Sequence, residues 1–222
     1  NLIRKLLTLK FSEQQIQRYS RHILLDQIGG SGQASLINAK VLVIGAGGLG
    51  SPVILYLAAA GVGTIGVIDD DLVDLSNLQR QILHTTRSIG TAKVLSAKKT
   101  IYEINPEVKL IPIQERIRPD NAMDLIASYD LVADGSDNFE TRFLVNDACY
   151  FSHKTLVSAA IQRFYGQIYT FKPHKKDANG NQLPCYRCLF PKAPPVGQIP
   201  TCAEAGVLGA LCGTIGSLQT TE

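Results

Sequence analysis

The stretch from residue 41 to residue 93 limits the possible fold of this chain more than any other. An apolar run at residues 41–44 leads into a glycine-rich turn at residues 45–50, and a second apolar run ends at Asp69. A buried strand, a glycine turn into a helix and an acid about 20 residues further on are typical of a parallel α/β sheet that binds a nucleotide. The turn lacks the GxxxxGK[ST] pattern of a P-loop, so cations for a polyphosphate must come from other segments.

The remaining hydrophobic pattern predicts alternating strands and helices. Strands are expected at residues 41–44, 64–69, 108–114 and 131–133, with helices up to residue 60 and at residues 90–104, 121–128 and 140–151. This alternation predicts a doubly wound, mostly parallel Rossmann-like sheet of the α/β class. Two further strands, at residues 155–160 and 166–171, are too close in sequence for a crossover helix, so we expect an antiparallel extension of the sheet.

The N-terminal segment predicts helices that precede the sheet. Ser12 and Gln15 form a capping-box pattern that opens a helix carrying Arg18, Tyr19, Arg21 and His22, and a second helix is expected at residues 31–38. We therefore expect a single domain over residues 1–222. It has a helical arm at 1–39, a nucleotide-binding core at 40–150, and an extension at 151–222 that includes a loop excursion at 173–200 and an apolar helix at 206–218.

Composition excludes several classes of protein. The 222 residues are 45% hydrophobic and 18% charged, as in an ordinary globular domain, and a formal charge of +3 is too small to indicate a nucleic-acid binder. The uncharged run at residues 205–221 is diluted by polar residues, which favours a buried helix over a membrane span. Five cysteines without a secretory signal favour the cytoplasm. The chain begins without Met and stops inside the last expected helix, so we expect both ends to be cut.

Three glycines of the turn have distinct expected roles, and the cations after it favour ATP over NAD. Gly45, Gly47 and Gly50 provide the turn, the close approach to a phosphate and the tight helix contact. Arg80 and Lys93 would serve a triphosphate but have little use in a dehydrogenase. Each alone is more often a solvated surface charge; their coincidence with the glycine turn and Asp69 favours a nucleotide site.

Asp137 and Asn138 follow the fourth expected strand, so they reach the same edge of the sheet as Asp69. The Asp137 carboxylate could hold Mg²⁺ bound to a nucleotide. It could also cap the helix at 140–151, and the two roles are compatible.

The cysteines divide into three groups. Cys185 and Cys188 form a C-x-x-C pair, which is half of a tetrahedral zinc site. Cys202 precedes an expected helix, where it could be a nucleophile or simply a structural thiol. Cys149 and Cys212 lie in apolar helices and are expected in the core. The four histidines share no spacing, and none is assigned to catalysis.

Taken together, the motifs R-Y-S-R-H-I, G-A-G-G-L-G-S, S-N-L-Q-R-Q, D-G-S-D-N and P-C-Y-R-C resemble those of the E1-like adenylyltransferases. The chain is most similar to the MoeB-type branch of the ThiF/MoeB/HesA family, over residues 18–222. The resemblance implies that a ubiquitin-like sulfur carrier protein is adenylylated by ATP and Mg²⁺ at its C-terminal Gly-Gly carboxylate. Acyl-AMP and pyrophosphate would form, for molybdopterin or thiamin sulfur transfer.

The resemblance also implies roles for individual residues. Gly48 and the neighbouring turn residues approach the nucleotide, Asp69 binds the ribose, Asp137 positions Mg²⁺, and Arg21 reaches the ATP site of a second subunit in a homodimer. The phosphates are contacted by Asn77, Arg80 and Lys93, and Gln81 and Asn138 complete the nucleotide-binding set. A second C-x-x-C that would complete the zinc site is absent from this sequence. In relatives the cysteine matching Cys202 either forms a thioester or persulfide or is dispensable.

Two other functions remain open from the sequence. An NAD-dependent oxidoreductase would share the glycines and Asp69, but it would leave Arg80, Lys93 and Asp137 without a role. A catalytically silent dimer that only presents a carrier protein would not need these charges at all. The sequence does not distinguish between the possible carrier proteins.

Overall fold

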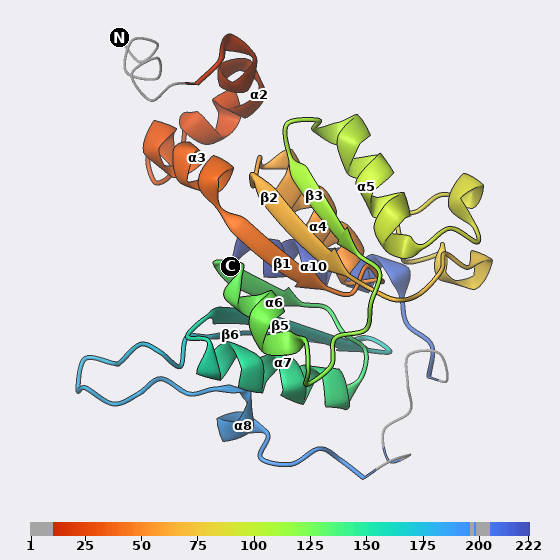
Figure 1. The fold of residues 1–222 in the computed structure, drawn as a ribbon, viewed down its shortest axis with the longest axis vertical. Coiled ribbons are helices and arrows are strands. Elements are labelled where there is room, and N and C mark those ends of the chain that lie inside the picture. The colour runs from red at the N-terminus through yellow and green to blue at the C-terminus, as the bar shows by residue number, and fades with distance from the viewer. Residues whose placement is uncertain (1–10, 196–197, 199–204) are drawn as a thin grey trace.

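One sheet of six strands, in the order β3-β2-β1-β4-β5-β6, organises the fold (Figure 1). The computed structural model describes residues 11–195, 198 and 205–222. The strands are β1 (Lys40–Ile44), β2 (Thr64–Ile68), β3 (Lys109–Ile113), β4 (Leu131–Asp134), β5 (Thr155–Gln162) and β6 (Tyr165–Phe171). All neighbouring strands pair in parallel except β5 and β6, which are antiparallel. The predicted fold class, including the antiparallel extension, is confirmed.

The strand order reverses at β1, which lies between β2 and β4. In the register, Ile44 at the end of β1 is level with Ile68 on β2 and with Asp134 on β4. The segments that follow these three strands therefore start side by side at the carboxyl edge of the sheet. In open α/β sheets this switch point is where ligands bind.

Helices cover both faces of the sheet. The side chains of β1 therefore alternate between two apolar cores, one on each face. Val43 belongs to a buried cluster with α4 (Gly50–Ala59) and α5 (Lys93–Ile104), whereas Leu42 belongs to one with α6 (Ala122–Ala127) and α7 (Phe139–Phe151). The last helix, α10 (Gly209–Thr221), packs against α4 and the β5–β6 pair. Such alternation is what a strand buried on both faces requires.

The N-terminal arm lies at the amino edge of the sheet, opposite the switch point. It consists of α2 (Glu13–Ile23) and α3 (Gly29–Asn38), and the predicted capping box at Ser12 is present. The Tyr19 hydroxyl accepts a hydrogen bond of 2.8 Å from Asn105, which ends α5 just before β3, and Arg18 donates to the carbonyl of Ile104. The arm is thus fixed to loops that lead into the strands (Figure 1).

A few boundaries differ from the sequence prediction. Helix α5 begins at Lys93 and not at residue 90, because Gly90 has a φ of +81° and the chain before Lys93 pairs with residues 72–73 instead. Two short 3-10 helices, Leu75–Asn77 and Thr86–Ser88, were not predicted. Within the excursion a single short helix, α8 (Tyr186–Leu189), is present among the described residues. None of the described helices has both the length and the apolar character needed to cross a membrane.

Candidate nucleotide site

The glycine turn between β1 and α4 has a shape that only glycine allows at two positions. Gly45 has a φ of +88°, and its N–H donates to the carbonyl of Ile68 at 2.9 Å. A Cβ at Gly50 would overlap the carbonyl oxygen of Gly45. In the described part of the chain, the N–H groups of Gly47, Gly48 and Leu49 have no hydrogen-bond acceptor. Free N–H groups at a helix N-terminus form an anion site.

Asp69 lies directly beside this turn, at the end of β2. Its Oδ2 accepts the N–H of Ala46 at 2.8 Å and its Oδ1 accepts the N–H of Asp71 at 2.9 Å. Burial raises the pKa of the Asp69 carboxyl above its ordinary value, although the Lys93 ammonium and the two N–H groups oppose the shift. The side chain is therefore fixed at the switch point, where it can also accept a hydroxyl.

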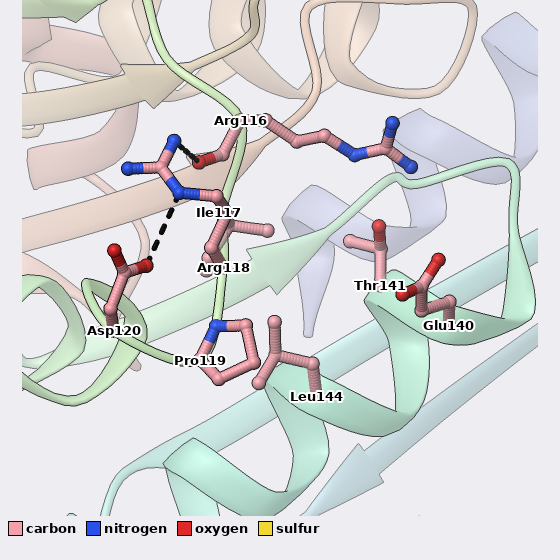
Figure 2. A pocket seen from close by; sticks show the side chains of 8 residues that line it. All are labelled: Arg116, Ile117, Arg118, Pro119, Asp120, Glu140, Thr141 and Leu144. Carbon is pink, nitrogen blue, oxygen red and sulfur yellow. Dashed lines mark hydrogen bonds and ion pairs between the residues drawn. The ribbon is translucent and has the colours of Figure 1, made fainter.

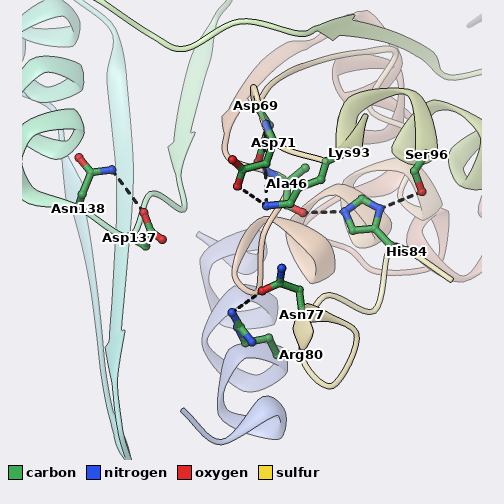
Figure 3. Close-up of polar contacts among 10 residues, drawn as sticks. All are labelled: Ala46, Asp69, Asp71, Asn77, Arg80, His84, Lys93, Ser96, Asp137 and Asn138. Carbon is green, nitrogen blue, oxygen red and sulfur yellow. Dashed lines mark hydrogen bonds and ion pairs between the residues drawn. The ribbon is translucent and has the colours of Figure 1, made fainter. Parts of the chain in front are cut away.

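Lys93 brings a buried positive charge to the same place (Figure 3). Its side chain is only 5% exposed, and its Nζ lies 2.6 Å from Oδ2 of Asp71 and 4.0 Å from Oδ1 of Asp69. Lys93 is the first residue of α5, whereas the sequence predicted it three residues into the helix, and its N–H donates to the carbonyl of Asp71. Asp71 was not predicted as part of the site, because an acid in a loop usually marks an ordinary exposed surface.

Arg80 and Asn77 form a second polar group next to the turn. Arg80 donates from Nη2 to Oδ1 of Asn77 at 2.7 Å. A Cβ placed on Gly48 would lie 3.5 Å from Cγ of Arg80, so the stem of the arginine runs along the glycine turn. Gln81 is buried, and no atom of the described residues is hydrogen-bonded to its Oε1.

Asp137 and Asn138 lie at the same edge but apart from the other site residues (Figure 3). Asn138 caps α7 by accepting the N–H of Thr141 at 2.8 Å, so the expectation that Asp137 caps this helix is wrong. Asn138 has the extended backbone of an N-cap, and its side chain can fold back onto the first turn. The Asp137 carboxylate is exposed, and its Oδ1 accepts a long bond of 3.3 Å from the Asn138 amide.

A cavity of about 590 Å³ opens beside the end of β3 (Figure 2). It is lined by residues 116–120 and by Glu140, Thr141 and Leu144 from the start of α7. The side chain of Arg116 extends across it toward α7, whereas Arg118 is tied to Asp120 at 3.2 Å. This cavity was not predicted from the sequence, because nothing in the loop pattern distinguishes these arginines from surface residues.

Arg21 and the cysteine pair are also outside this cluster. Arg21 is exposed on α2, at the opposite edge of the sheet. Cys185 is the N-cap of α8 and Cys188 lies within this helix, which packs against α7, and their Sγ atoms are 3.8 Å apart. Cys202 lies outside the described residues.

The two cysteines expected in the core are there. Cys149 and Cys212 are both buried, and burial raises the pKa of the Cys149 thiol far above its ordinary value. Neither thiol is therefore suited to act as a nucleophile.

Comparisons with known proteins identify the family. Residues 19–222 match the ThiF family. The chain is 48% identical over 216 residues to the SAMP-activating enzyme E1 of Haloferax volcanii, and 48% identical over 214 residues to the sulfur carrier protein adenylyltransferase of Thermus thermophilus. These alignments cover 97% and 96% of this chain and 77% and 78% of the relatives. A third relative, the probable adenylyltransferase/sulfurtransferase MoeZ of Mycobacterium tuberculosis, is 49% identical; the alignment covers 95% of this chain and 53% of MoeZ.

Solved structures agree on the fold. Escherichia coli MccB, solved with ATP, superposes with a TM-score of 0.74 at 24% identity, over 92% of this chain and 62% of MccB. This chain thus spans about three fifths of the length of that enzyme. The crystal structure of PaaA superposes with a TM-score of 0.76 at 22% identity, over 95% of this chain and 64% of PaaA. With its parallel sheet, its glycine turn and relatives that are nearly half identical, this chain belongs to the ThiF family, the family of E1-like adenylyltransferases that its motifs predicted.

Proposed function

We propose that this domain transfers AMP from ATP to the C-terminal glycine carboxylate of a ubiquitin-like sulfur carrier protein. A carboxylate oxygen attacks the α-phosphorus and forms a new P–O bond. The bond from the α-phosphorus to the oxygen bridging to the β-phosphate breaks, and pyrophosphate leaves with that electron pair. The products are an acyl-adenylate and pyrophosphate.

One observation carries this proposal. The glycine turn, Asp69, Lys93 and Arg80 converge at one edge of the sheet in a chain whose relatives include a sulfur carrier protein adenylyltransferase. The attacking carboxylate and the triphosphate are both anions and repel each other. Preorganised cations in a partly dry site lower that repulsion without any reorganisation during the reaction.

The contacts around the turn support an orientation for ATP. The free N–H groups at the start of α4 would bind phosphate oxygens, and Lys93, Arg80 and Asn77 would flank the phosphates. The Asp69 carboxylate would accept the ribose hydroxyls. The cavity beside Ile117 and Leu144 would receive the purine base, because it adjoins the end of β3 and has an apolar part of its lining.

Mg²⁺ would be held by Asp137, whose exposed carboxylate has an uncommitted Oδ2 in the described part of the chain. Bound to the phosphates, the ion would neutralise negative charge on the leaving pyrophosphate. Asn138 contributes indirectly, because its own Oδ1 is used to cap α7 and thereby fixes the start of the helix beside Asp137.

A homodimer would bring Arg21 to the reaction. The N-terminal arm is anchored at the amino edge through Tyr19, whereas the nucleotide site lies at the carboxyl edge. Arg21 is exposed and lies away from the site of its own subunit, and its side chain has no hydrogen bond or ion pair among the described residues. We propose that it adds a cation to the ATP site of a second subunit.

Cys185 and Cys188 would supply two thiolate ligands to zinc. With Zn–S bonds of about 2.3 Å, the edge of a tetrahedron is about 3.8 Å. The Sγ–Sγ separation of 3.8 Å matches this edge. The pair is held without a metal, because the N–H of Tyr186 bonds to Asn146 at 2.8 Å and Arg187 pairs with Asp147 at 2.6 Å. Zinc would add a structural crosslink here and would take no part in the reaction.

The setting we propose is sulfur transfer for molybdopterin or thiamin in the cytoplasm. Cys202 would be the residue that takes the reaction beyond adenylylation: its thiolate would attack the carbonyl carbon of the acyl-adenylate, a thioester with the carrier would form, and AMP would leave.

ATP–pyrophosphate exchange with a panel of purified sulfur carriers tests the proposed function. We expect exchange that depends on a carrier with a C-terminal Gly-Gly, and none when the last glycine is deleted. An Arg80→Ala variant with unchanged folding should lose most of the exchange. Carrier binding without exchange would favour the silent dimer, and NADH-dependent absorbance changes would favour an oxidoreductase.

A further inference from the structure

The ring of His84 lies beside Ala46 of the glycine turn and contacts the carbonyl oxygen of the peptide that joins Ala46 to Gly47 (Figure 3). Its Nε2 lies 2.9 Å from the carbonyl oxygen of Ala46, and its Nδ1 lies 3.0 Å from the hydroxyl oxygen of Ser96. His84 and Ser96 are both buried. A buried ring with partners at both nitrogens has one fixed orientation.

The partners also fix the tautomer of the ring. A carbonyl oxygen can only accept, so the hydrogen must be on Nε2, and Nδ1 then accepts the Ser96 hydroxyl. Burial lowers the pKa of His84, the Ala46 carbonyl opposes this, and the nearby Lys93 ammonium lowers it further. The neutral ring with hydrogen on Nε2 is thus the form that fits this site at neutral pH.

This contact has a consequence for the nucleotide. Both polar groups of Ala46 are held from the protein side, its N–H by Asp69 and its C=O by His84. The Ala46–Gly47 peptide bond is trans, so the Gly47 N–H points opposite to the Ala46 carbonyl, away from His84. That N–H has no acceptor in the described part of the chain. It faces the space in front of the turn, where a phosphate would bind.

We infer that His84 is a positioning residue of the nucleotide site, because its Nε2–H orients the Ala46–Gly47 peptide so that the Gly47 N–H donates to a phosphate of the nucleotide. The inference rests on the proposed function, since it requires a phosphate in front of the turn. His84 itself touches no reacting atom, and its effect should appear only for ligands that carry phosphates.

Two substitutions separate this role from general packing. Glutamine can place its amide N–H near the position of Nε2, whereas asparagine reaches only the position of Nδ1. Loss of one hydrogen bond to a charged group weakens binding by roughly tenfold or more. We expect His84→Asn to weaken ATP binding by about tenfold while adenosine binding stays within about twofold, and His84→Gln to restore most of the ATP affinity.

The experiment is titration calorimetry, which measures the affinities for ATP and for adenosine. It compares variants whose thermal stability matches that of the original protein. His153→Asn, an exposed histidine at a φ of +54° that asparagine tolerates, is the control and should bind both ligands as the original protein does. If His84→Asn does not fold, Ser96→Ala is the alternative. It keeps the imidazole ring but removes the hydroxyl that fixes the ring proton on Nε2, and it should still lower the affinity for ATP more than the affinity for adenosine.

The outcomes are separable. Equal losses for ATP and adenosine, no loss for either, or a His84→Gln variant as weak as His84→Asn would each overturn the positioning role and leave the proposed function standing. If the unmodified protein binds neither ATP nor adenosine, the nucleotide site is wrong, and the role of His84 falls with it.

Discussion

Replacing Lys93 by alanine removes a buried charge that should serve both folding and catalysis. The ammonium lies 2.6 Å from the Asp71 carboxylate and 4.0 Å from that of Asp69, and the Lys93 side chain is 5% exposed. The substitution should therefore lower both the free energy of unfolding and the rate, by different amounts.

The stability loss is the smaller effect. The Asp71 carboxylate is 66% exposed, so this pair contributes less than about 1 kcal/mol. At 4.0 Å the attraction to Asp69 is about 4 kcal/mol at an effective dielectric constant of 20, but burying the ammonium offsets most of it. We expect a net loss of about 1 to 2 kcal/mol, which lowers Tm by roughly 2 to 8 °C.

The rate loss is the larger effect. Removing one preorganised group that stabilises transition-state charge costs about 3 to 4 kcal/mol, a hundred- to a thousandfold in rate. ATP–pyrophosphate exchange at saturating ATP and carrier measures it, and urea unfolding measures the stability. Lys98→Ala, on an exposed position of the same helix, is the matched control. The reasoning is refuted if folded Lys93→Ala protein exchanges as fast as the control.

The pH dependence gives an independent check. Without Lys93 the Asp69 carboxyl loses the main cationic influence that lowers its pKa, so its folded-state pKa rises further above the ordinary 3.8. A carboxyl whose pKa is higher in the folded state costs stability above that pKa, and the cost disappears as pH falls toward 3.8. The stability deficit of Lys93→Ala should therefore shrink on acidification through this window. A deficit that stays constant would contradict the assignment to Asp69.

Three further predictions follow from the structure. Gly50→Ala should destabilise the fold by about 2 to 4 kcal/mol in urea unfolding, because the new Cβ overlaps the carbonyl of Gly45; Gly213→Ala, which meets nothing within 4 Å, should be neutral or stabilising. Arg21→Ala and Lys93→Ala subunits should each be inactive. Mixing them should restore roughly a quarter of the exchange activity if subunits reassort freely, since half of the dimers then have one intact site; no recovery would show that Arg21 does not act at the site of the second subunit. Cys188→Ser should remove zinc measured by metal analysis, whereas Cys149→Ala should not; equal zinc in both would exclude the cysteine pair as ligands.

The fold was predictable from sequence because each strand is a short apolar run and the glycine turn allows few alternatives. The antiparallel β5–β6 pair was predictable for a simpler reason, since two strands so close in sequence cannot be joined by a crossover. The position of Asp69 at the carboxyl edge was predictable because the carboxyl ends of parallel strands meet there. The structure places Lys93 beside it, with its Nζ 4.0 Å from Asp69.

Other features depend on packing that sequence spacing does not reveal. Asp71 became a partner of Lys93 only because the loop after β2 turns back over the start of α5. His84 and Ser96 belong to different segments 12 residues apart and meet because α5 packs beside the turn. Asp137 and Asn138 are both good capping residues, and propensity alone could not decide which of them caps α7.

The sequence pattern of α2 also did not predict at which edge of the sheet the N-terminal arm packs. This position follows from the hydrogen bond between Tyr19 and Asn105, which are far apart in the chain. That contact keeps Arg21 away from the candidate nucleotide site of its own subunit.

Intact-mass analysis of a sulfur carrier incubated with this protein, ATP and Mg²⁺ tests the central claim most directly. We predict a carrier that gains the mass of AMP less water, that forms together with pyrophosphate, and that reverts to carrier and ATP when excess pyrophosphate is added. If no carrier with a Gly-Gly C-terminus acquires this mass while the protein is folded and binds ATP, the adenylylation of a carrier by this site is contradicted.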